Sequence, residues 1–212
     1  AENLAFDTQE DYPLDDELHR RYSNLLSERG HWFDVSFSSG KLGALSRQQR
    51  QLTWTTPLTE HWRMALDLHQ NTQKTQDVTV LGIPPKQSDA LNVSFTHHLE
   101  QSDWTIAIHK ADSLAAYTGW RVAQRYKFDS QLAANWLWSQ HQESSDSTGL
   151  LVAGMKNRLA ASINWAPTGR EYVNAEFAMD NYLSQNGQAL GDGTILTVDA
   201  GHRLFSEQPD HV

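Results

Sequence analysis

Ten histidines are the first residues in this sequence that could do chemistry, because imidazole binds metal ions and transfers protons. His97 and His98 are adjacent, so in a strand they would point to opposite faces, and His61 and His69 lie too far apart along one strand to share an ion unaided. No HExxH or comparable ligand spacing occurs, and the chain has no cysteine. We therefore expect no metal and no cofactor.

Hydrolysis is the enzymatic alternative, and it needs a serine or paired carboxylates beside an oriented histidine. His98 and Glu100 would share one face of a strand, and so would Asp103, Thr105 and His109. Polar alternation alone produces such groupings, and the sequence has neither a Gly-x-Ser-x-Gly motif nor a phosphate-binding loop. We expect no enzyme, with an outer-membrane barrel hydrolase as the alternative.

The elements that would carry these side chains are strands, and the alternation is clearest over residues 89–138. We expect four strands there, at 89–100, 103–112, about 119–128 and from 132 onward. In the second of them, one face carries Trp104, Ile106 and Ile108, and the other carries Thr105, Ala107 and His109. A period of two means one apolar and one polar face. A soluble sandwich could use that pattern, and so could a barrel in lipid with a wet lumen.

Further alternating segments raise the expected number to about ten strands. They are at 31–39, 45–58, 61–70, 150–165, 171–182 and 194–205. Tight turns at 57–60, 101–103, 129–131 and 167–170 alternate with longer loops at 71–88, 113–118, 143–148 and 184–193. Because outer-membrane barrels have short periplasmic turns and long extracellular loops, we predict an all-β, antiparallel up-and-down transmembrane β-barrel.

The two ends of the sequence differ from its middle. Residues 1–30 form an acidic lead-in with helical spacing over Leu14–Arg29, so we divide the chain into this lead-in helix and a barrel part at 31–212. Phe205–Pro209 resembles the short turns, and the sequence stops where another strand is expected. A barrel in lipid leaves no unpaired edge, so either the strands close at about ten or this chain is part of a larger barrel, and we expect the latter.

Bulk composition excludes some classes of partner. The net charge of −9 and the pI of about 5.5 argue against nucleic-acid binding, and there is no apolar run long enough for a transmembrane helix. Tryptophan concentrates at membrane–water interfaces, although it is also common in the core of a soluble sandwich. The tryptophans that we expect at the interface with outer-membrane lipid are Trp54, Trp62, Trp104, Trp120, Trp136, Trp138 and Trp165.

The polar faces of the expected strands would line a lumen and form the path of a polymer. The acids on that path are Asp34, Asp67, Glu100, Asp103, Glu176, Asp180 and Asp199, and its main bases are Arg121, Arg125 and Arg158. Such a mixed wall lets a polymer slide without tight binding. The alternative for each single residue is a cross-strand ion pair of purely structural value, about 0.2–1 kcal/mol.

Several short segments resemble the C-terminal barrel of the PelB family of outer-membrane exporters of the Pel exopolysaccharide. The similar segments are Val152–Leu159, Gly169–Val173, Tyr182–Gly187 and Leu190–Gly193, with Asp15–Arg29 and Arg47–Leu52 also alike. The resemblance implies a tetratricopeptide-repeat scaffold ahead of a barrel of about sixteen strands. It also implies a biofilm function, namely export of a partly deacetylated and therefore cationic amino-sugar polymer.

The same resemblance implies partners. These are a PelC-like lipoprotein ring at the periplasmic face and, through the repeats, a periplasmic modification enzyme. A cationic polymer suits a net-acidic conduit. A soluble β-sandwich that binds carbohydrate is the alternative from another class.

Overall fold

The computed structural model describes residues 30–75, 84–168 and 171–202, which form ten strands and one short helix. The expected lead-in helix and residues 203–212 lie outside the described residues. The elements in order are β1 (Trp32–Leu42), β2 (Leu45–Pro57), β3 (Trp62–Thr75), β4 (Gln87–His98), β5 (Ser102–Asp112), β6 (Ala116–Lys127), β7 (Leu132–Glu143), α4 (Thr148–Ala153), β8 (Gly154–Trp165), β9 (Glu171–Ser184) and β10 (Ala189–His202). No helix in the described part of the chain is long and apolar enough to cross a membrane.

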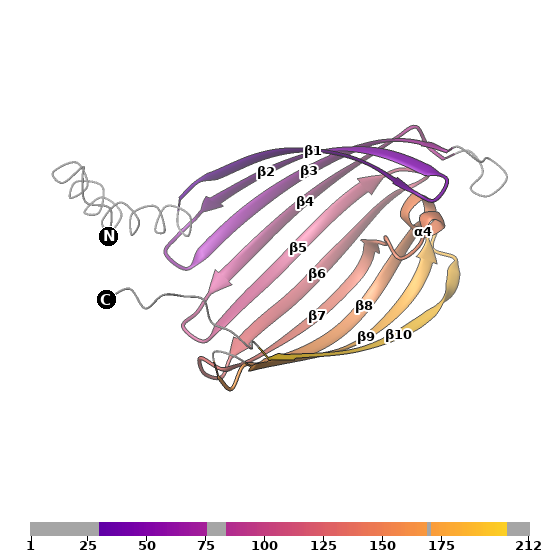
Figure 1. The fold of residues 1–212 in the computed structure, drawn as a ribbon. Coiled ribbons are helices and arrows are strands. Elements are labelled where there is room, and N and C mark those ends of the chain that lie inside the picture. Colours follow the sequence, from indigo (N-terminus) through magenta and orange to yellow (C-terminus); the bar gives the residue numbers. More distant parts are fainter. Residues whose placement is uncertain (1–29, 76–83, 169–170, 203–212) are drawn as a thin grey trace.

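All ten strands belong to one antiparallel sheet in which each strand pairs with the next along the chain. Figure 1 shows this sheet curling from β1 round to β10. The predicted up-and-down antiparallel topology is confirmed. Within the described residues β1 and β10 do not pair with each other, so the structure is an open, partial β-barrel.

The connections lie at two ends of the sheet, which we call the turn end and the loop end. The turn end carries the connections 58–61, 99–101, 128–131 and 166–170. Side-chain oxygens stabilise these turns: Thr59 Oγ1 accepts from the backbone N–H of Trp62 at 3.1 Å, and Asp129 Oδ1 accepts from that of Leu132 at 2.8 Å. Such local bonds are the reason that Thr and Asp favour turns.

The loop end differs from the prediction. Its connections are 43–44, 76–86, 113–115, the segment 144–153 that contains α4, and 185–188. Only two of them are long, because β3, β6, β9 and β10 continue into segments whose polarity had indicated loops. Polar residues occur in strands as readily as in loops once the strand rises above an apolar zone. The predicted strand 150–165 is also wrong at its start, because residues 148–153 are helical.

Helix α4 folds against the loops instead of extending β8. Its N-cap is Ser147, whose side chain accepts a hydrogen bond from the backbone N–H of Leu150. The Gln185 side chain holds it in place: its Nε2 donates to the Val152 carbonyl at 3.3 Å, and its Oε1 accepts from the backbone N–H of Leu114 at 3.0 Å. Three connections at the loop end are thereby joined.

One ion pair shows which way the sheet curls. Arg47 Nη2 on β2 lies 3.1 Å from Glu143 Oε1 at the end of β7. In a flat sheet those strands would be about 24 Å apart, since neighbouring strands are about 4.8 Å apart. The contact therefore requires the sheet to curl toward the face that carries Arg47. This face is polar, so the concave wall is polar and the apolar side chains lie on the convex face.

Candidate functional site

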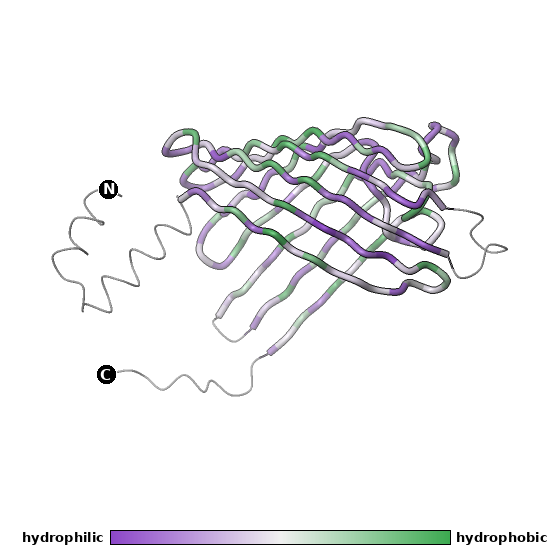
Figure 2. Tube along the Cα trace, turned by 90° about the horizontal axis from the view of Figure 1, so that it is seen from above, coloured by the Kyte–Doolittle hydropathy of each residue, from purple (hydrophilic) through white to green (hydrophobic). Residues whose placement is uncertain are grey.

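The convex face carries a continuous belt of large apolar side chains. Each strand contributes two to four of them at every second position, which the alternating colours along the strands in Figure 2 make visible. Ile108 on β5 is 59% exposed and Leu159 on β8 is 48% exposed. A connected apolar surface of this size does not face water in a soluble monomer. The belt therefore matches the lipid-facing band of a membrane barrel.

The belt crosses the hydrogen-bonded rows of the sheet obliquely. Its loop-end limit is Phe37 on β1 and Leu196 on β10, and the strand registers place these two residues about eight positions apart over nine strand-to-strand steps. With a rise of about 3.3 Å per residue and a strand spacing of about 4.8 Å, that offset corresponds to a strand tilt of roughly 30°. Membrane barrels tilt their strands by about 35–45°. The offset has no equivalent requirement in a soluble sandwich.

Six of the seven tryptophans predicted at the membrane interface lie along the borders of the belt. Trp120 and Trp138 are at its loop-end border, where their rings pack edge to face with centroids 4.7 Å apart. The turn-end border carries Trp54, Trp62, Trp104 and Trp165. The sequence therefore places amphipathic rings where lipid would meet water.

Trp136 lies within the belt instead of at its border. It packs edge to face on Trp104 with ring centroids 5.6 Å apart, and its indole Nε1 donates to Gln124 Oε1 at 2.7 Å. That hydrogen bond satisfies the indole N–H of Trp136 and the Oε1 atom of Gln124 inside an apolar surface. A buried indole N–H normally requires such a partner.

The concave wall carries nearly all the charged residues predicted for the lumen. The acids on it are Asp34, Asp67, Asp103, Glu176, Asp180 and Asp199, and the bases are Arg121, Arg125 and Arg158. The prediction is wrong for Glu100, because β4 ends at His98 and Glu100 lies exposed in the turn 99–101. A role of these residues in guiding a polymer stays a prediction.

Arg158 organises one group of charges on this wall. Its guanidinium lies 2.6 Å from Glu176 Oε1 and 3.2 Å from Asp180 Oδ2. Asp180 is fully buried, and Lys156 Nζ is 3.9 Å from the same Oδ2 atom. A buried carboxylate requires such compensation. These residues form a structural network along β8 and β9.

Three other wall acids lack a cation within 4.0 Å among the described residues. Asp67 accepts hydrogen bonds from Thr53 Oγ1 at 2.8 Å and from Asn92 Nδ2 at 3.0 Å, both neutral donors. Asp34 faces Thr53 across the strand pair β1–β2, and Asp199 faces Asn174 across β9–β10. The negative charge of these three residues is therefore available to a cation in the lumen.

Arg121 is the contrasting case on β6. A hollow of about 490 Å³ in the wall is lined by Arg121, Thr105, Asn135, Ser162 and Glu176. The Arg121 Nε atom is buried and has no hydrogen-bond partner within the described structure. The wall is thus mixed in charge, with Arg121 and Arg125 on β6 and acids on β1, β3, β5, β9 and β10.

The loop-end contacts were not foreseen from the sequence. Arg47 is held by Asn71 Oδ1 at 2.9 Å as well as by Glu143, and Gln185 is buried among backbone groups of two other connections. The Arg47–Glu143 and Gln185–Leu114 contacts join residues 96 and 71 positions apart, and the Gln185–Val152 bond joins residues 33 apart. Local sequence patterns carry no signal for such pairs.

Asp146 lies in the loop-end segment outside the strands. Burial alone would raise the pKa of its carboxyl group, but hydrogen bonds from Lys156 and Tyr182 and the Lys156 charge outweigh this effect and hold the pKa below its usual value. Lys156 Nζ is 2.8 Å from Asp146 Oδ2, and Ser144 Oγ donates to the same oxygen at 3.2 Å. Asp146 therefore anchors the loop that precedes α4.

Hydrolysis and metal binding each require particular side chains close together. His98 Nδ1 lies 2.8 Å from Asp103 Oδ1, but within the described chain no serine hydroxyl is hydrogen-bonded to this histidine. The pair thus lacks the nucleophile of a catalytic triad. Among the same residues, no three His, Asp or Glu side chains gather closely enough to hold a metal ion.

The family model of the PelB C-terminal beta barrel domain matches residues 28–212. Among solved structures, the chain is similar to a "Bacterial polysaccharide outer membrane secretin", with a TM-score of 0.61 and 10% identity over 77% of this chain and 51% of that one. At that identity the likeness shows the fold alone, and this chain spans about half of its structural neighbour. None of the curated proteins matches. Because the family model covers most of the sequence, the chain belongs to the PelB C-terminal β-barrel domain family and is a protein of the bacterial outer membrane.

Proposed function

We propose that this chain forms part of an outer-membrane pore through which an exopolysaccharide leaves the cell, and that it performs no chemistry of its own. The observation that carries the proposal is the division of the curled sheet into an apolar convex belt and a polar concave wall. A hydrated wall of mixed charge offers many weak contacts and no deep binding site. Membership of the PelB barrel family supports polysaccharide export.

The ten strands of the described sheet do not close on themselves. The outer edges of β1 and β10 would expose unpaired backbone groups to lipid, at a cost of several kcal/mol for each group. We therefore infer that further strands pair with these edges in the complete protein, within a barrel of about sixteen. The half-length match to the structural neighbour is consistent with a larger barrel.

The polymer that suits this wall is a partly deacetylated amino sugar, whose free amino groups are cationic. Asp34, Asp67 and Asp199 carry charges that no described cation compensates within 4.0 Å, and their neighbours on the wall are neutral hydrogen-bonding groups. Amino groups could pass from one such carboxylate to the next. Acetylated units would meet the neutral amides and hydroxyls between them.

We further propose partners in the export of biofilm matrix. If the short turns face the periplasm, as in other outer-membrane barrels, the turn end would meet a PelC-like lipoprotein ring. A repeat domain ahead of the barrel would bring a periplasmic modification enzyme to the entrance. Family membership supports these partners. The net charge of −9 disfavours nucleic acid as a partner.

The test neutralises the uncompensated acids in the full-length protein, expressed in cells that lack their own copy. The triple variant Asp34→Asn, Asp67→Asn, Asp199→Asn should export several-fold less polymer at an equal amount of folded barrel. Each of the three single changes should alter export less than about twofold, because two uncompensated acids remain. The single reversal Glu176→Lys should also have less than about a twofold effect, because Arg158 retains Asp180 as a partner. Exported polymer and barrel abundance are measured together.

The matched control removes neutral wall groups from the same region through Ser36→Ala, Ser94→Ala and Thr197→Ala. Normal export by the triple acid variant would contradict the cationic polymer, while loss of export in the control as well would indicate that any change to the wall blocks passage. If Glu176→Lys alone abolishes export while the barrel inserts normally, the polymer is bound at a specific site that includes Glu176 and not by many weak contacts along the wall. Failure of the wild-type chain to restore export would contradict the pore itself.

A further inference from the structure

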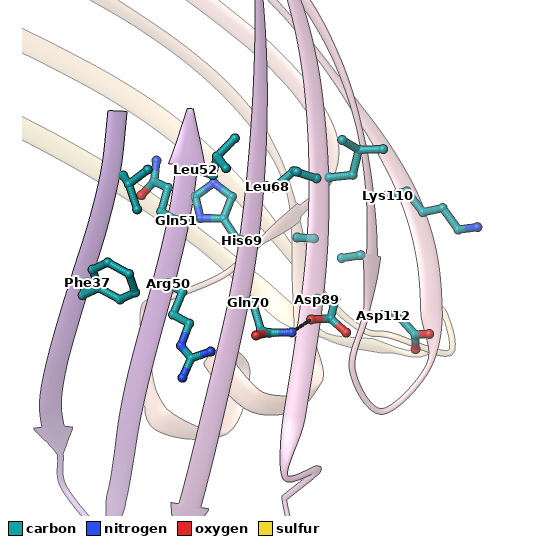
Figure 3. Close-up of a pocket in the computed structure, with 14 residues that line it drawn as sticks. Phe37, Arg50, Gln51, Leu52, Leu68, His69, Gln70, Asp89, Lys110 and Asp112 are labelled. Carbon is teal, nitrogen blue, oxygen red and sulfur yellow. Dashed lines mark hydrogen bonds between the residues drawn. The ribbon is translucent and has the colours of Figure 1, made fainter. Parts of the chain in front are cut away.

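A groove of about 640 Å³ lies on the convex face where the apolar belt meets the loop end, across β1 to β5. Figure 3 shows its side chains in place. Phe37, Leu52, Leu68 and Leu91 form its apolar part. The basic side chains of Arg50 and Lys110 border it. The groove faces away from the lumen, so the polymer path does not account for it.

Arg50 and Lys110 occupy equivalent places relative to the belt. Each is the first polar outward residue above the belt on its strand, following Leu52 on β2 and Ile108 on β5. Both side chains are exposed, and among the described residues no carboxylate oxygen lies within 4.0 Å of either charge. Basic side chains at the edge of an apolar band attract anionic lipid headgroups.

The spacing of the two cations constrains the ligand. They lie three strands apart, so their Cα atoms are about 14–16 Å apart. One phosphate cannot contact both side chains closely at that separation, whereas a headgroup with a phosphate at each end can. On the belt side of the two cations, Leu52, Leu68 and Leu91 form an apolar strip that can take an acyl chain. Gln70 and Asp89 lie in the row of Arg50, between the two basic strands.

We propose that this groove binds a diphosphorylated acylated glycolipid of the outer leaflet, with one phosphate at Arg50, the other at Lys110, and an acyl chain along Phe37, Leu52 and Leu68. A cation at each end of the groove and the apolar side chains of Leu52, Leu68 and Leu91 along its belt side point to this ligand. The inference rests on the outer-membrane location of the barrel and on the loop end facing outward. It does not depend on which polymer is exported.

Asp112 and Asp89 both line the groove, and each opposes anion binding. Asp89 is the acid placed between the two basic residues. It lies on β4 between the two basic strands, and its carboxylate accepts hydrogen bonds from Gln70 Nε2 at 3.2 Å and from Gln87 Nε2 at 3.2 and 3.1 Å. These bonds disperse its charge, and Asp112 lies directly across from it. A bound headgroup would feel the repulsion of Asp89, so the substitution Asp89→Asn should tighten binding.

The experiment uses the full-length protein, purified in detergent and freed of native lipid, with lipid A as the probe. Native mass spectrometry measures the fraction of barrel that retains one lipid. We expect the double variant Arg50→Ala, Lys110→Ala to retain at least about fivefold less lipid A, and Asp89→Asn to retain more. The control Lys41→Ala, Lys74→Ala removes two exposed, loop-end cations that do not line the groove and should bind like the wild type.

Wild-type protein provides a second test that needs no substitution. Dephosphorylated lipid A and phosphatidylcholine should each be retained much less than lipid A, and phosphatidylglycerol, with one phosphate, should be retained to an intermediate extent. Equal retention of the dephosphorylated lipid, undiminished binding by the double variant, or weaker binding by Asp89→Asn would each overturn the inference. A barrel that inserts and exports but shows no lipid preference would leave the proposed function intact.

Discussion

Asp180 is the residue on the wall with the least freedom. Its side chain is fully buried, Arg158 and Lys156 supply the opposite charges, and one of its two carboxylate oxygens has no hydrogen-bond partner in the described structure. Removing one member of a buried ion pair is costly because the remaining charge stays buried without compensation. Glu176, which contacts the same arginine, is 43% exposed, so water screens its charge.

The substitution Asp180→Ala should therefore destabilise the barrel by about 1–3 kcal/mol, since Arg158 and Lys156 lose their buried partner and keep only the more exposed Glu176 and Asp146. Glu176→Gln, the matched control on the same arginine, should cost less than about 1 kcal/mol. The measurement is the urea midpoint of refolding into lipid vesicles, followed by tryptophan fluorescence. Equal midpoints for the two variants would show that the network does not stabilise the wall.

The low pKa of Asp146 gives the loop end a dependence on pH. A carboxyl group whose folded pKa lies below its unfolded value of about 3.9 stabilises the fold above that value, and this contribution is lost as the pH falls through the folded pKa. Asp146→Asn should thus lower the melting temperature at pH 7, and the difference from wild type should shrink as the pH falls through the lowered pKa of Asp146. Circular dichroism melts of both proteins at pH 3, 5 and 7 measure this. A difference that stays constant with pH would contradict it.

Strand β7 contains a β-bulge near its loop end. The pairing of β7 with β8 shifts register between Ser139 and Gln142, and His141 takes a φ of 53° at that point. Such a bulge re-aims the strand end and leaves backbone groups to be satisfied locally. The His141 carbonyl accepts a hydrogen bond from His109 Nε2 at 2.7 Å, and its N–H donates to Asn157 Oδ1 at 2.9 Å.

Gly119 on β6 makes room for this arrangement. A Cβ atom at this position would overlap the His109 ring and the backbone carbonyl oxygens of Gln140 and His141. Gly119→Ala should displace His109, break its bond to His141, and lower the melting temperature by several degrees. Gly40→Ala, in the open on β1, is the control and should leave the melting temperature within about 1 °C. If both variants melt alike, the crowding at the bulge is relieved without cost.

At the scale of the whole molecule, the oblique belt ties the sheet to a flat membrane. Ile106 on β5 lies in the belt between Phe95 and Val122 on the neighbouring strands. Asn92 on β4 points to the opposite, concave side, where its side chain contacts Asp67. The two positions lie on neighbouring strands and differ in the face that they occupy. Substituting the same residue at each position therefore distinguishes the cost of placing a charge in lipid from the cost of disturbing strand pairing.

Ile106→Lys should cost about 2–4 kcal/mol of folding in lipid, because a lysine near the bilayer midplane loses its hydration. Asn92→Lys should be tolerated, since the new ammonium group would meet Asp67 in a hydrated lumen. Urea titration of both variants in vesicles gives the cost, and the outer-membrane fraction of expressing cells gives the amount inserted. Equal behaviour of the two variants would contradict the assignment of the convex face to lipid.

The alternation of side chains along each strand was readable in the sequence, and with it came the ten strands, their antiparallel order and the faces of Asp67, Ile106 and Arg158. A period of two is a local property, and a strand that separates lipid from water must display it in consecutive residues. Strand ends were not readable in this way. Glu100 and residues 71–75 are polar, and polarity does not distinguish a loop from a strand that rises into water.

Only the tertiary structure decided the contacts that cross the concave side. The ion pair Arg47–Glu143 and the bonds of Gln185 exist because the sheet curls, and the degree of curling depends on the twist and tilt of all ten strands together. Helix α4 likewise forms where folded loops supply partners for a segment whose sequence also suits a strand. The local sequence determined which side chains lie on the concave wall, and the curvature of the whole sheet determined which of them contact one another across it.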